Sequence, residues 1–450
     1  MTATLRDLLT LAWPIVVSRS TQTVIGVSDA LMVAHLGEAS LAATTTGAMN
    51  TFTLLILPMG VCFIVSSFSA QLHGGGDSAG ARRYGWYGLG LAVATQLLCL
   101  VTLPVVGWAL GGLGYAPDVL AQMNDYMAIR LWGGGAAIGL EALANYYGGL
   151  GDTRVPMRAN VLAMVCNVGL NWVLIDGHLG VPAMGVAGAA LASAISSGLA
   201  FLYLFSRFWR QATPSPVTWR WPEFGRMLRF GLPSGMNWFL EFMAFMFFIN
   251  VVVGGLGTTS LAAMMAVIQI NSVSFMPAFG MASAGAILVG QHIGAGFKDA
   301  VPGIAKMTLK VCATWQGTVG LLYLLMPGLI FAPFAKGPAH EAQALLAIGA
   351  HMLLLSSLWQ LFDSGVAVFA EALRAAGDTA WPMWARTVLG WAFFVPGSWY
   401  TVQRLGWGVD AAMFWIVGYI GLLALLMVLR FRAGVWRGIE LVQGAPGAHG

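Results

Sequence analysis

Long apolar runs separated by short polar loops are the feature that most constrains this chain. Hydrophobic residues make up 58% of its 450 residues and charged residues only 9%, whereas a typical soluble domain carries about 25% charged residues. A soluble fold of this size could not cover its surface with so few charges. The runs are continuous and reach the roughly 20 residues that a transmembrane helix needs, so we expect helices and not a β-barrel.

The pattern predicts an all-α integral membrane protein with twelve transmembrane helices. Their expected ranges are 10–36, 45–70, 85–110, 121–147, 157–177, 184–206, 230–254, 260–290, 303–332, 341–372, 384–403 and 409–430.

The basic residues predict the orientation of these spans. Cytoplasmic loops carry an excess of Lys and Arg, and the termini and every second loop hold nearly all of the 22 basic residues. The opposite loops hold only Lys336 and Arg404, while Arg19 and Arg130 fall within spans. Both termini are therefore expected in the cytoplasm. The residues assigned to the cytoplasmic side are Arg6, Arg82, Arg83, Arg154, Arg158, Arg207, Arg210, Arg220, Arg226, Arg229, Lys298, Lys306, Lys310, Arg374, Arg386, Arg430, Arg432 and Arg437.

The two halves of the chain resemble each other at an offset of about 220 residues. Five matches recur in the same order, and six spans separate equivalent points, so the halves are expected to be parallel repeats. The matches are Pro14 with Pro233, Leu36-Gly37 with Leu256-Gly257, Pro58 with Pro277, Gln71 to Gly76 with Gln291 to Gly296, and Gly151-Asp152-Thr153 with Gly377-Asp378-Thr379.

This repeat predicts two lobes of six helices, 1–206 and 230–450, joined by a basic cytoplasmic linker at 207–229. Such an architecture places a substrate cavity between the halves and suits alternating access by rocking. Because that cavity lies within one chain, we expect a monomer.

Three carboxylates lie well inside apolar runs: Asp29, Glu241 and Asp363. An ionisable group in the hydrocarbon is costly, so its presence indicates function by default. A carboxylate there can carry a proton, or bind Na+ if neighbouring oxygens complete the shell. The alternative is a structural role in which interhelical hydrogen bonds satisfy each carboxylate.

Other polar residues supply candidate partners for these carboxylates. Asn167 and Asn171 are four residues apart and share one helix face, although polar side chains also simply hold membrane helices together. Glu141 is expected to pair with Arg130 or Arg19. The repeated Gly-Asp-Thr segments are expected to form tight turns, with Asp able to cap the following helix.

Aromatic and methionine side chains are abundant, and most are expected to face lipid or pack between helices. Some could line a cavity for flat, cationic, apolar compounds through cation–π contacts and adaptable packing. The candidates nearest the predicted midplane are Phe242, Phe245, Met246, Phe275 and Met276.

Together these features resemble the MATE family, the multidrug and toxic compound extrusion transporters. The resemblance covers nearly the whole chain. It rests on Pro14 leading to Asp29 and Leu36-Gly37, on the duplicated Gln-x-x-Gly and Gly-Asp-Thr-x-x-Pro-Met segments, and on the pair Asn167 and Asn171.

The resemblance implies V-shaped N- and C-lobes and export of organic cations and other amphipathic compounds in exchange for Na+ or H+. It implies a cation site in the N-lobe at Asp29, Asn167 and Asn171, with Ser193 where a neighbouring hydroxyl ligand occurs. Glu241 and Asp363 match acidic residues of the C-lobe in the NorM-like branch. The choice between Na+ and H+, and between the two lobes, stays open.

Other functions fit the sequence less well. Exporters or flippases of an endogenous metabolite or a lipid-linked substrate are the alternative, but the near absence of buried Arg and Lys disfavours an anionic headgroup. No HExxH, GxSxG or phosphate-binding GxxxxGK[ST] motif indicates an enzyme, and two diverged halves fit a channel poorly. No cofactor and no nucleic acid is expected, and the four separate cysteines predict neither a disulfide nor a metal site. The expected location is the bacterial inner membrane.

Overall fold

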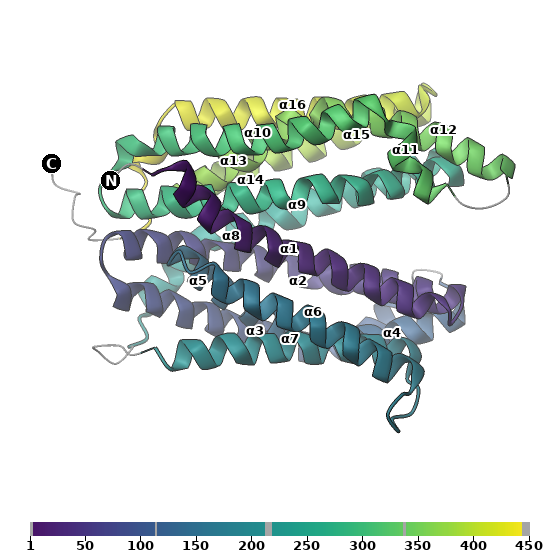
Figure 1. Cartoon of the computed structure of the whole chain (residues 1–450), viewed down its shortest axis with the longest axis horizontal. Coiled ribbons are helices and arrows are strands. Elements are labelled where there is room, and N and C mark those ends of the chain that lie inside the picture. The colour runs from purple at the N-terminus through teal and green to yellow at the C-terminus, as the bar shows by residue number, and fades with distance from the viewer. Residues whose placement is uncertain (1–2, 113–114, 212–217, 336–338, 443–450) are drawn as a thin grey trace. The chain divides into compact units, whose positions relative to one another are not determined.

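The computed structural model describes residues 3–112, 115–211, 218–335 and 339–442, and these residues form helices joined by short connections (Figure 1). No strand occurs among them. The predicted loop cation Lys336 and part of the predicted linker, residues 212–217, lie outside the described residues.

In the first half, each predicted span coincides with helical structure. The helices are α1 (Leu5–Ala34), α2 (Glu38–Gly74), α3 (Ser78–Gly111), α4 (Pro117–Trp132), α5 (Gly134–Gly149), α6 (Arg154–Asp176) and α7 (Gly185–Trp209).

The predicted span 121–147 is broken into α4 and α5 at Gly133. Close contacts explain the glycines at this break, since a Cβ on Gly134 would lie 2.8 Å from the Cys99 sulfur. The backbone N–H of Gly135 donates to Gln96 Oε1 at 2.7 Å. Gln96 thus satisfies a donor that the start of a helix leaves without an intrahelical partner.

The second half follows the same order of spans with more interruptions. Its elements are α8 (Trp221–Phe247), η1 (Phe248–Val253), η2 (Gly254–Leu256), α9 (Thr258–Gly294), η3 (Lys298–Ala300), α10 (Val301–Leu325), α11 (Pro327–Phe331), η4 (Ala332–Phe334), α12 (Ala339–Ser356), η5 (Ser357–Trp359), α13 (Gln360–Ala376), α14 (Ala380–Val388), η6 (Leu389–Phe394), α15 (Val395–Trp399), η7 (Tyr400–Arg404), α16 (Gly408–Arg432) and η8 (Val435–Gly438).

Three of these elements, η1, η6 and η7, are π-helical. The first has a visible cause in the sequence: Gly37 follows Pro14 by 23 residues, whereas Gly257 follows Pro233 by 24. A π-helical turn closes over one more residue than an α-helical turn. The π-helical segment η1 therefore absorbs the extra residue. The side-chain amide of Gln403 donates to the carbonyls of Val251 and Val252 within it, at 3.2 and 2.9 Å.

By length and apolar composition alone, eight helical segments of the described chain can cross a membrane. The number is nine when the bent pair Lys298–Leu325 and Pro327–Phe334, which meet at 96°, counts as one span. The predicted spans 10–36, 121–147 and 384–403 are helical but fall outside this set. The first contains charged and hydroxyl side chains, and the other two are divided into short elements.

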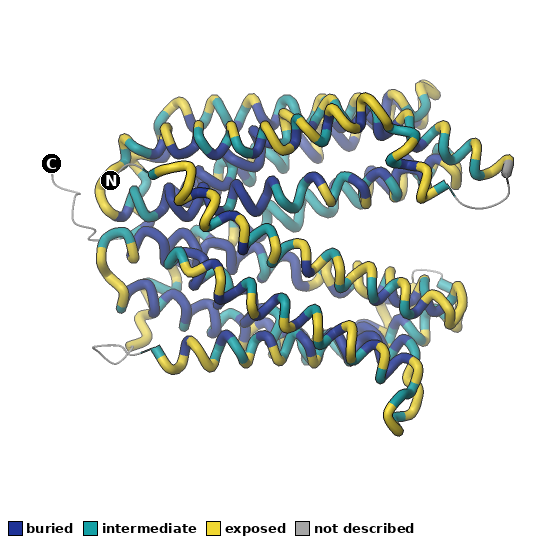
Figure 2. Tube along the Cα trace, in the orientation of Figure 1, coloured by how far each residue is buried: buried dark blue, intermediate teal, exposed yellow. Residues whose placement is uncertain are grey.

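The described chain divides into two compact units. Trp13–Gly235 forms the N-terminal unit, and the chain from Met236 onward, joined by the first residues through Ala12, forms the C-terminal unit. Within their units α2 and α9 have the largest buried shares of all candidate spans (Figure 2), so each serves as the central helix of its unit.

The predicted repeat is visible in the backbone. α2 and α9 both have 37 residues, and each is followed by a glycine with positive φ, 82° at Gly76 and 86° at Gly296. The Gly-Asp-Thr segments form the expected tight turns, with φ of 84° at Gly151 and 92° at Gly377.

The predicted capping role of the aspartates in these turns is wrong for the described helices. The residues that begin α6 and α14 are preceded by Thr153 and Thr379, and neither helix has a side-chain cap hydrogen bond. Asp378 instead accepts from Arg430 Nε at 2.7 Å, because α16 places a cation beside it.

Candidate ion-coupling sites

Asp29 lies in the interior of the N-terminal unit with three helices around it. α1 supplies Asp29, α6 supplies Asn167 and Asn171, and α7 supplies Ser193. The two asparagine residues are 0% exposed, and Asp29 and Ser193 are 7% and 6% exposed. The predicted grouping of these four residues is therefore present in the structure.

Hydrogen bonds join the four side chains into one network. Asn171 Nδ2 donates to Asp29 Oδ1 at 2.5 Å and to Asn167 Oδ1 at 3.3 Å. The Ser193 hydroxyl donates to Asp29 Oδ2 at 3.0 Å and accepts from Asn167 Nδ2 at 3.0 Å. Both carboxylate oxygens are thus held by neutral donors and not by a cation.

One buried polar atom of this network has no partner, the carbonyl oxygen Asn171 Oδ1. A buried acceptor without a donor is costly, and oxygen atoms are the ligands that hard cations prefer. With the Asp29 carboxylate it offers a place for a cation, while Asp29 alone offers a place for a proton. The network suits either ion.

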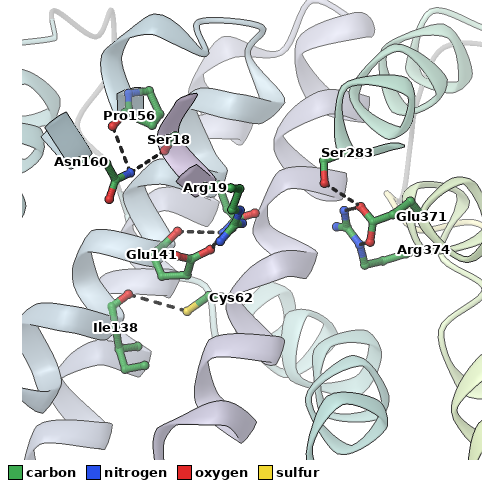
Figure 3. Close-up of polar contacts among 11 residues, drawn as sticks. Ser18, Arg19, Cys62, Ile138, Glu141, Pro156, Asn160, Ser283, Glu371 and Arg374 are labelled. Carbon is green, nitrogen blue, oxygen red and sulfur yellow. Dashed lines mark hydrogen bonds and ion pairs between the residues drawn. The ribbon is translucent and has the colours of Figure 1, made fainter. Parts of the chain in front are cut away.

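A second polar cluster lies in the same unit (Figure 3). Glu141 pairs with Arg19 at 3.2 Å, which decides the predicted choice between Arg19 and Arg130. Arg19 also lies over the Phe63 ring at 5.6 Å. Asn160 donates to Ser18 at 2.7 Å. Because Glu141 already has a fixed cation, it is a poorer candidate for ion exchange than Asp29.

In the C-terminal unit, Asp363 has only neutral hydrogen-bond partners among the described contacts. Gln316 Nε2 on α10 donates to Asp363 Oδ2 at 2.6 Å. The hydroxyl of Ser364, one residue along α13, donates to the side-chain oxygen of the same Gln316. The arrangement resembles that of Asp29, with an amide and a hydroxyl close to one carboxylate.

Glu241 has a different environment. It forms an ion pair with Arg386 on α14, and the Tyr419 hydroxyl on α16 donates to its other oxygen at 3.4 Å. Arg386 interacts electrostatically with both Glu241 and Asp363. Arg386 thus interacts with both predicted C-lobe acids, which share no hydrogen bond with each other among the described contacts.

One prediction about arginine is corrected by these contacts. The charge pattern assigns Arg386 to a cytoplasmic loop, but it lies inside α14 with its side chain only 12% exposed. Among the described residues Arg82, at 7% exposed, is the one buried Lys or Arg, in keeping with the expected near absence of buried basic side chains. Arg374, whose side chain is 11% exposed, pairs with Glu371, which accepts from Ser283 as well (Figure 3). A carboxylate or a backbone carbonyl compensates each charge.

The five predicted cavity residues, Phe242, Phe245, Met246, Phe275 and Met276, are half-buried in the C-terminal unit. Phe245 and Met246 pack against its hydrophobic core. Phe275 stacks on Phe279 with ring centroids 5.8 Å apart. Their part in binding substrate stays a prediction.

Sequence reasoning missed Arg386, Gln316, Ser364 and Tyr419 as members of the C-terminal site. For Arg386 a signal existed, because the aligned repeats Gly-Asp-Thr-x-x-Pro-Met place it at the position of Asn160, well inside a helix. The other three are common neutral residues in apolar runs, and nothing in their spacing distinguishes them.

A family model for MatE matches the chain twice, over residues 14–173 and 233–391. The chain belongs to the MatE family. The two matches begin at Pro14 and Pro233, the first pair of repeated residues, and so confirm the internal repeat. Membership makes this MatE chain a multi-pass membrane transporter and not an enzyme.

Relatives of known name resemble this MatE chain over nearly its whole length. It is 30% identical to a protein of Mesorhizobium japonicum named "Probable multidrug resistance protein NorM", covering 87% of this chain and 86% of the relative. Identity is 28% to a Rhizobium meliloti protein of the same name, over 98% and 95% of the two chains. Identity is also 28% to "Multidrug resistance protein PmpM" of Pseudomonas aeruginosa, over 90% of this chain and 85% of the relative.

Solved structures show the same fold. A MOP superfamily transporter from Pyrococcus furiosus matches with a TM-score of 0.87 at 20% identity, over 96% of this chain and 97% of that one. A multidrug resistance MATE transporter solved in an outward-facing conformation matches with a TM-score of 0.85 at 21% identity, over 96% of each chain. The predicted fold of twelve spans in two six-helix repeats is thereby confirmed.

Proposed function

We propose that this MatE chain is a secondary active multidrug efflux transporter that exports organic cations and amphipathic compounds in exchange for Na+ or H+. The observation that carries the proposal is the network around Asp29. It combines a buried carboxylate with neutral amide and hydroxyl partners and an unpartnered oxygen. The names of the NorM and PmpM relatives, which are multidrug resistance proteins, support drugs as the transported compounds.

The coupling ion acts at Asp29 in this proposal. When Asp29 is ionised and empty, its charge in a low-dielectric interior favours taking up a cation or a proton. Binding of that ion neutralises the charge and changes which helix positions of α1, α6 and α7 are favourable. A ligand that binds one conformation more tightly shifts the equilibrium toward that conformation. An ion gradient can therefore bias the conformational cycle.

The same proposal assigns the membrane and the topology. The relatives named NorM and PmpM are bacterial proteins, which favours the bacterial inner membrane. The basic residues near the helix ends favour cytoplasmic termini. We propose lobes at 1–206 and 230–450 with the linker 207–229 between them, and a monomer as the transporting unit.

Export of a metabolite or a lipid-linked compound is the alternative. Arg386 and Arg374 are half-buried cations of the kind an anionic headgroup would need, but each is already paired with a carboxylate. No arginine of these two is left to bind an anion without breaking its pair, so cationic cargo is favoured.

Transport by purified protein in liposomes tests the proposal. A fluorescent cationic dye is followed under an imposed Na+ gradient and, separately, under an imposed proton gradient. Movement driven by either gradient in the wild type, and lost in Asp29→Asn, is expected. If neither gradient moves dye, the drug antiporter proposal is wrong.

A further inference from the structure

Arg386 is a charged residue at a repeat position where the first half has a neutral one. Asn160 on α6 and Arg386 on α14 occupy the same position after the Gly-Asp-Thr turn. Asn160 donates to Ser18 on α1, and Arg386 pairs with Glu241 on α8. The same two spans of each half are therefore joined by a neutral hydrogen bond in one unit and by an ion pair in the other.

Contacts between α8 and the π-helical segment η6 lie near the ion pair in the sequence. Ala244 of α8 packs beside Gly390 of η6, with its Cβ 3.6 Å from the position that a Cβ on Gly390 would take. The indole N–H of Trp391 donates to the Leu240 carbonyl at 3.1 Å. These contacts lie close to Glu241 and Arg386 along the chain, and they join α8 to η6 next to the ion pair.

The charges of this cluster leave a single negative site. Glu241 and Arg386 cancel, and Asp363 has Gln316 as its hydrogen-bonding partner, which is neutral. With both carboxyl groups ionised and Arg386 protonated, the cluster carries a net charge of −1. Without Arg386 the same residues would carry two negative charges and no resident cation. Arg386 Nε has no hydrogen-bond partner of its own, so only Glu241 holds this guanidinium among the described contacts.

We propose that Arg386 acts as a built-in counter-ion. It neutralises the Glu241 carboxylate and so restricts the C-terminal site to ligands with one positive charge. The inference rests on the proposed function and names its substrate class as monocations. A ligand with a second positive charge would have to place it near Arg386, and unfavourable juxtaposition of like charges is an effective means of rejecting a ligand.

Two dyes with the same phenanthridinium ring test this. Ethidium carries one positive charge and propidium carries an additional quaternary ammonium. Binding of each to the purified full chain in detergent is measured by fluorescence polarisation, giving a Kd ratio. We expect the wild type to prefer ethidium. Arg386→Asn, which installs the residue of the first half, should improve the relative affinity for propidium about tenfold, since one charge interaction near a protein surface is worth at least that much.

Further variants separate charge from structure. Arg386→Lys keeps the charge and should keep the wild-type ratio, and Glu241→Gln combined with Arg386→Asn should return to it. Arg374→Asn, which removes a paired arginine elsewhere in the unit, should not change it. If Arg386→Asn does not fold, Arg386→Gln takes its place with the same expectation.

The outcomes distinguish the inference from the function on which it rests. An unchanged ratio in Arg386→Asn with ethidium still bound would overturn the counter-ion role and leave the transporter proposal standing. The same shift in Arg386→Lys as in Arg386→Asn would also overturn it, because shape and not charge would then decide. A wild type that binds neither dye overturns both.

Discussion

Gly37 and Gly257 have nearly the same backbone conformation, although 220 residues separate them. Their φ and ψ angles are 112° and 171° at Gly37, and 102° and 166° at Gly257. Each precedes the first residue of a central helix, and in each case the carbonyl accepts from the residue four positions on, at 3.1 Å. Residues with a side chain rarely adopt this backbone conformation, so glycine is required where the chain enters α2 and α9.

Replacing either glycine by alanine should destabilise the protein by roughly 1–3 kcal/mol, the cost of holding a side chain in such a conformation. At both positions an added Cβ would have no atom within 4 Å, so the loss is conformational and not steric. Thermal unfolding of Gly37→Ala and Gly257→Ala in detergent measures it. Gly26→Ala, inside α1 and equally free of neighbours, is the control and should not lower the melting temperature.

Asp29→Asn should abolish gradient-driven export while the protein stays folded in the membrane. The substitution removes the ionisable charge and keeps the size of the side chain, and Asn167, Asn171 and Ser193 can still hydrogen-bond to it. Dye transport in liposomes is the measurement. Glu141→Gln is the matched control, since its carboxylate pairs with Arg19, and it should keep coupling. Normal coupled export by Asp29→Asn would remove Asp29 from the mechanism.

Glu241→Gln should lower stability by about 2 kcal/mol because it leaves Arg386 without its anion. The loss should be smaller than for a fully buried pair, since 28% of the Glu241 side-chain surface is exposed. Melting temperatures of Glu241→Gln, Arg386→Asn and the double variant give the coupling between the two residues. Purely additive losses would show that the pair contributes nothing to the fold.

Asp363→Asn should weaken the binding of cationic dye without a comparable loss of stability. Gln316 donates to Asp363 at 2.6 Å, and an asparagine oxygen can accept the same bond, so the structural contact survives while the negative charge is lost. Dye affinity and melting temperature are measured on the same preparation. Unchanged affinity would reduce Asp363 to a helix-packing residue.

Gln403→Ala should destabilise the π-helical segment η1 by about 1 kcal/mol, the usual net value of a lost hydrogen bond. The Gln403 amide donates to two carbonyls there, those of Val251 and Val252. Hydrogen exchange at residues 248–256 would report the loss locally. Protection equal to that of the wild type would show that η1 holds its form without this side chain.

The N-terminal site could be predicted from the sequence because its residues stand out by type and spacing. Asp29 is a lone carboxylate in an apolar run, and Asn167 and Asn171 show helical spacing. The partner of Glu241 could not be predicted in the same way. Arg386 lies near the start of a predicted span, and the pattern of basic residues assigns it to a cytoplasmic loop. Only the structure shows that its side chain is 12% exposed and paired with Glu241.

Breaks within spans were also invisible to hydropathy. The glycines at 133–135 interrupt a run that is otherwise long enough to be one helix, and the residues of η1 and η6 are mostly apolar, as in the helices beside them. Which turn becomes π-helical depends on the number of residues between fixed points and on partners such as Gln403, and neither is part of an apolar pattern.

The residue added at η1 bears on how the two halves could have diverged after a gene duplication. Counted from Pro233, the counterpart of Asp29 is Phe248; counted back from Gly257, it is Ile249. The insertion thus begins where the first half carries its carboxylate. An aspartate at either position would stand in a π-helical segment, whereas Asp29 lies in an α-helix. A single substitution there would therefore not reproduce the local backbone of the first half's ion site.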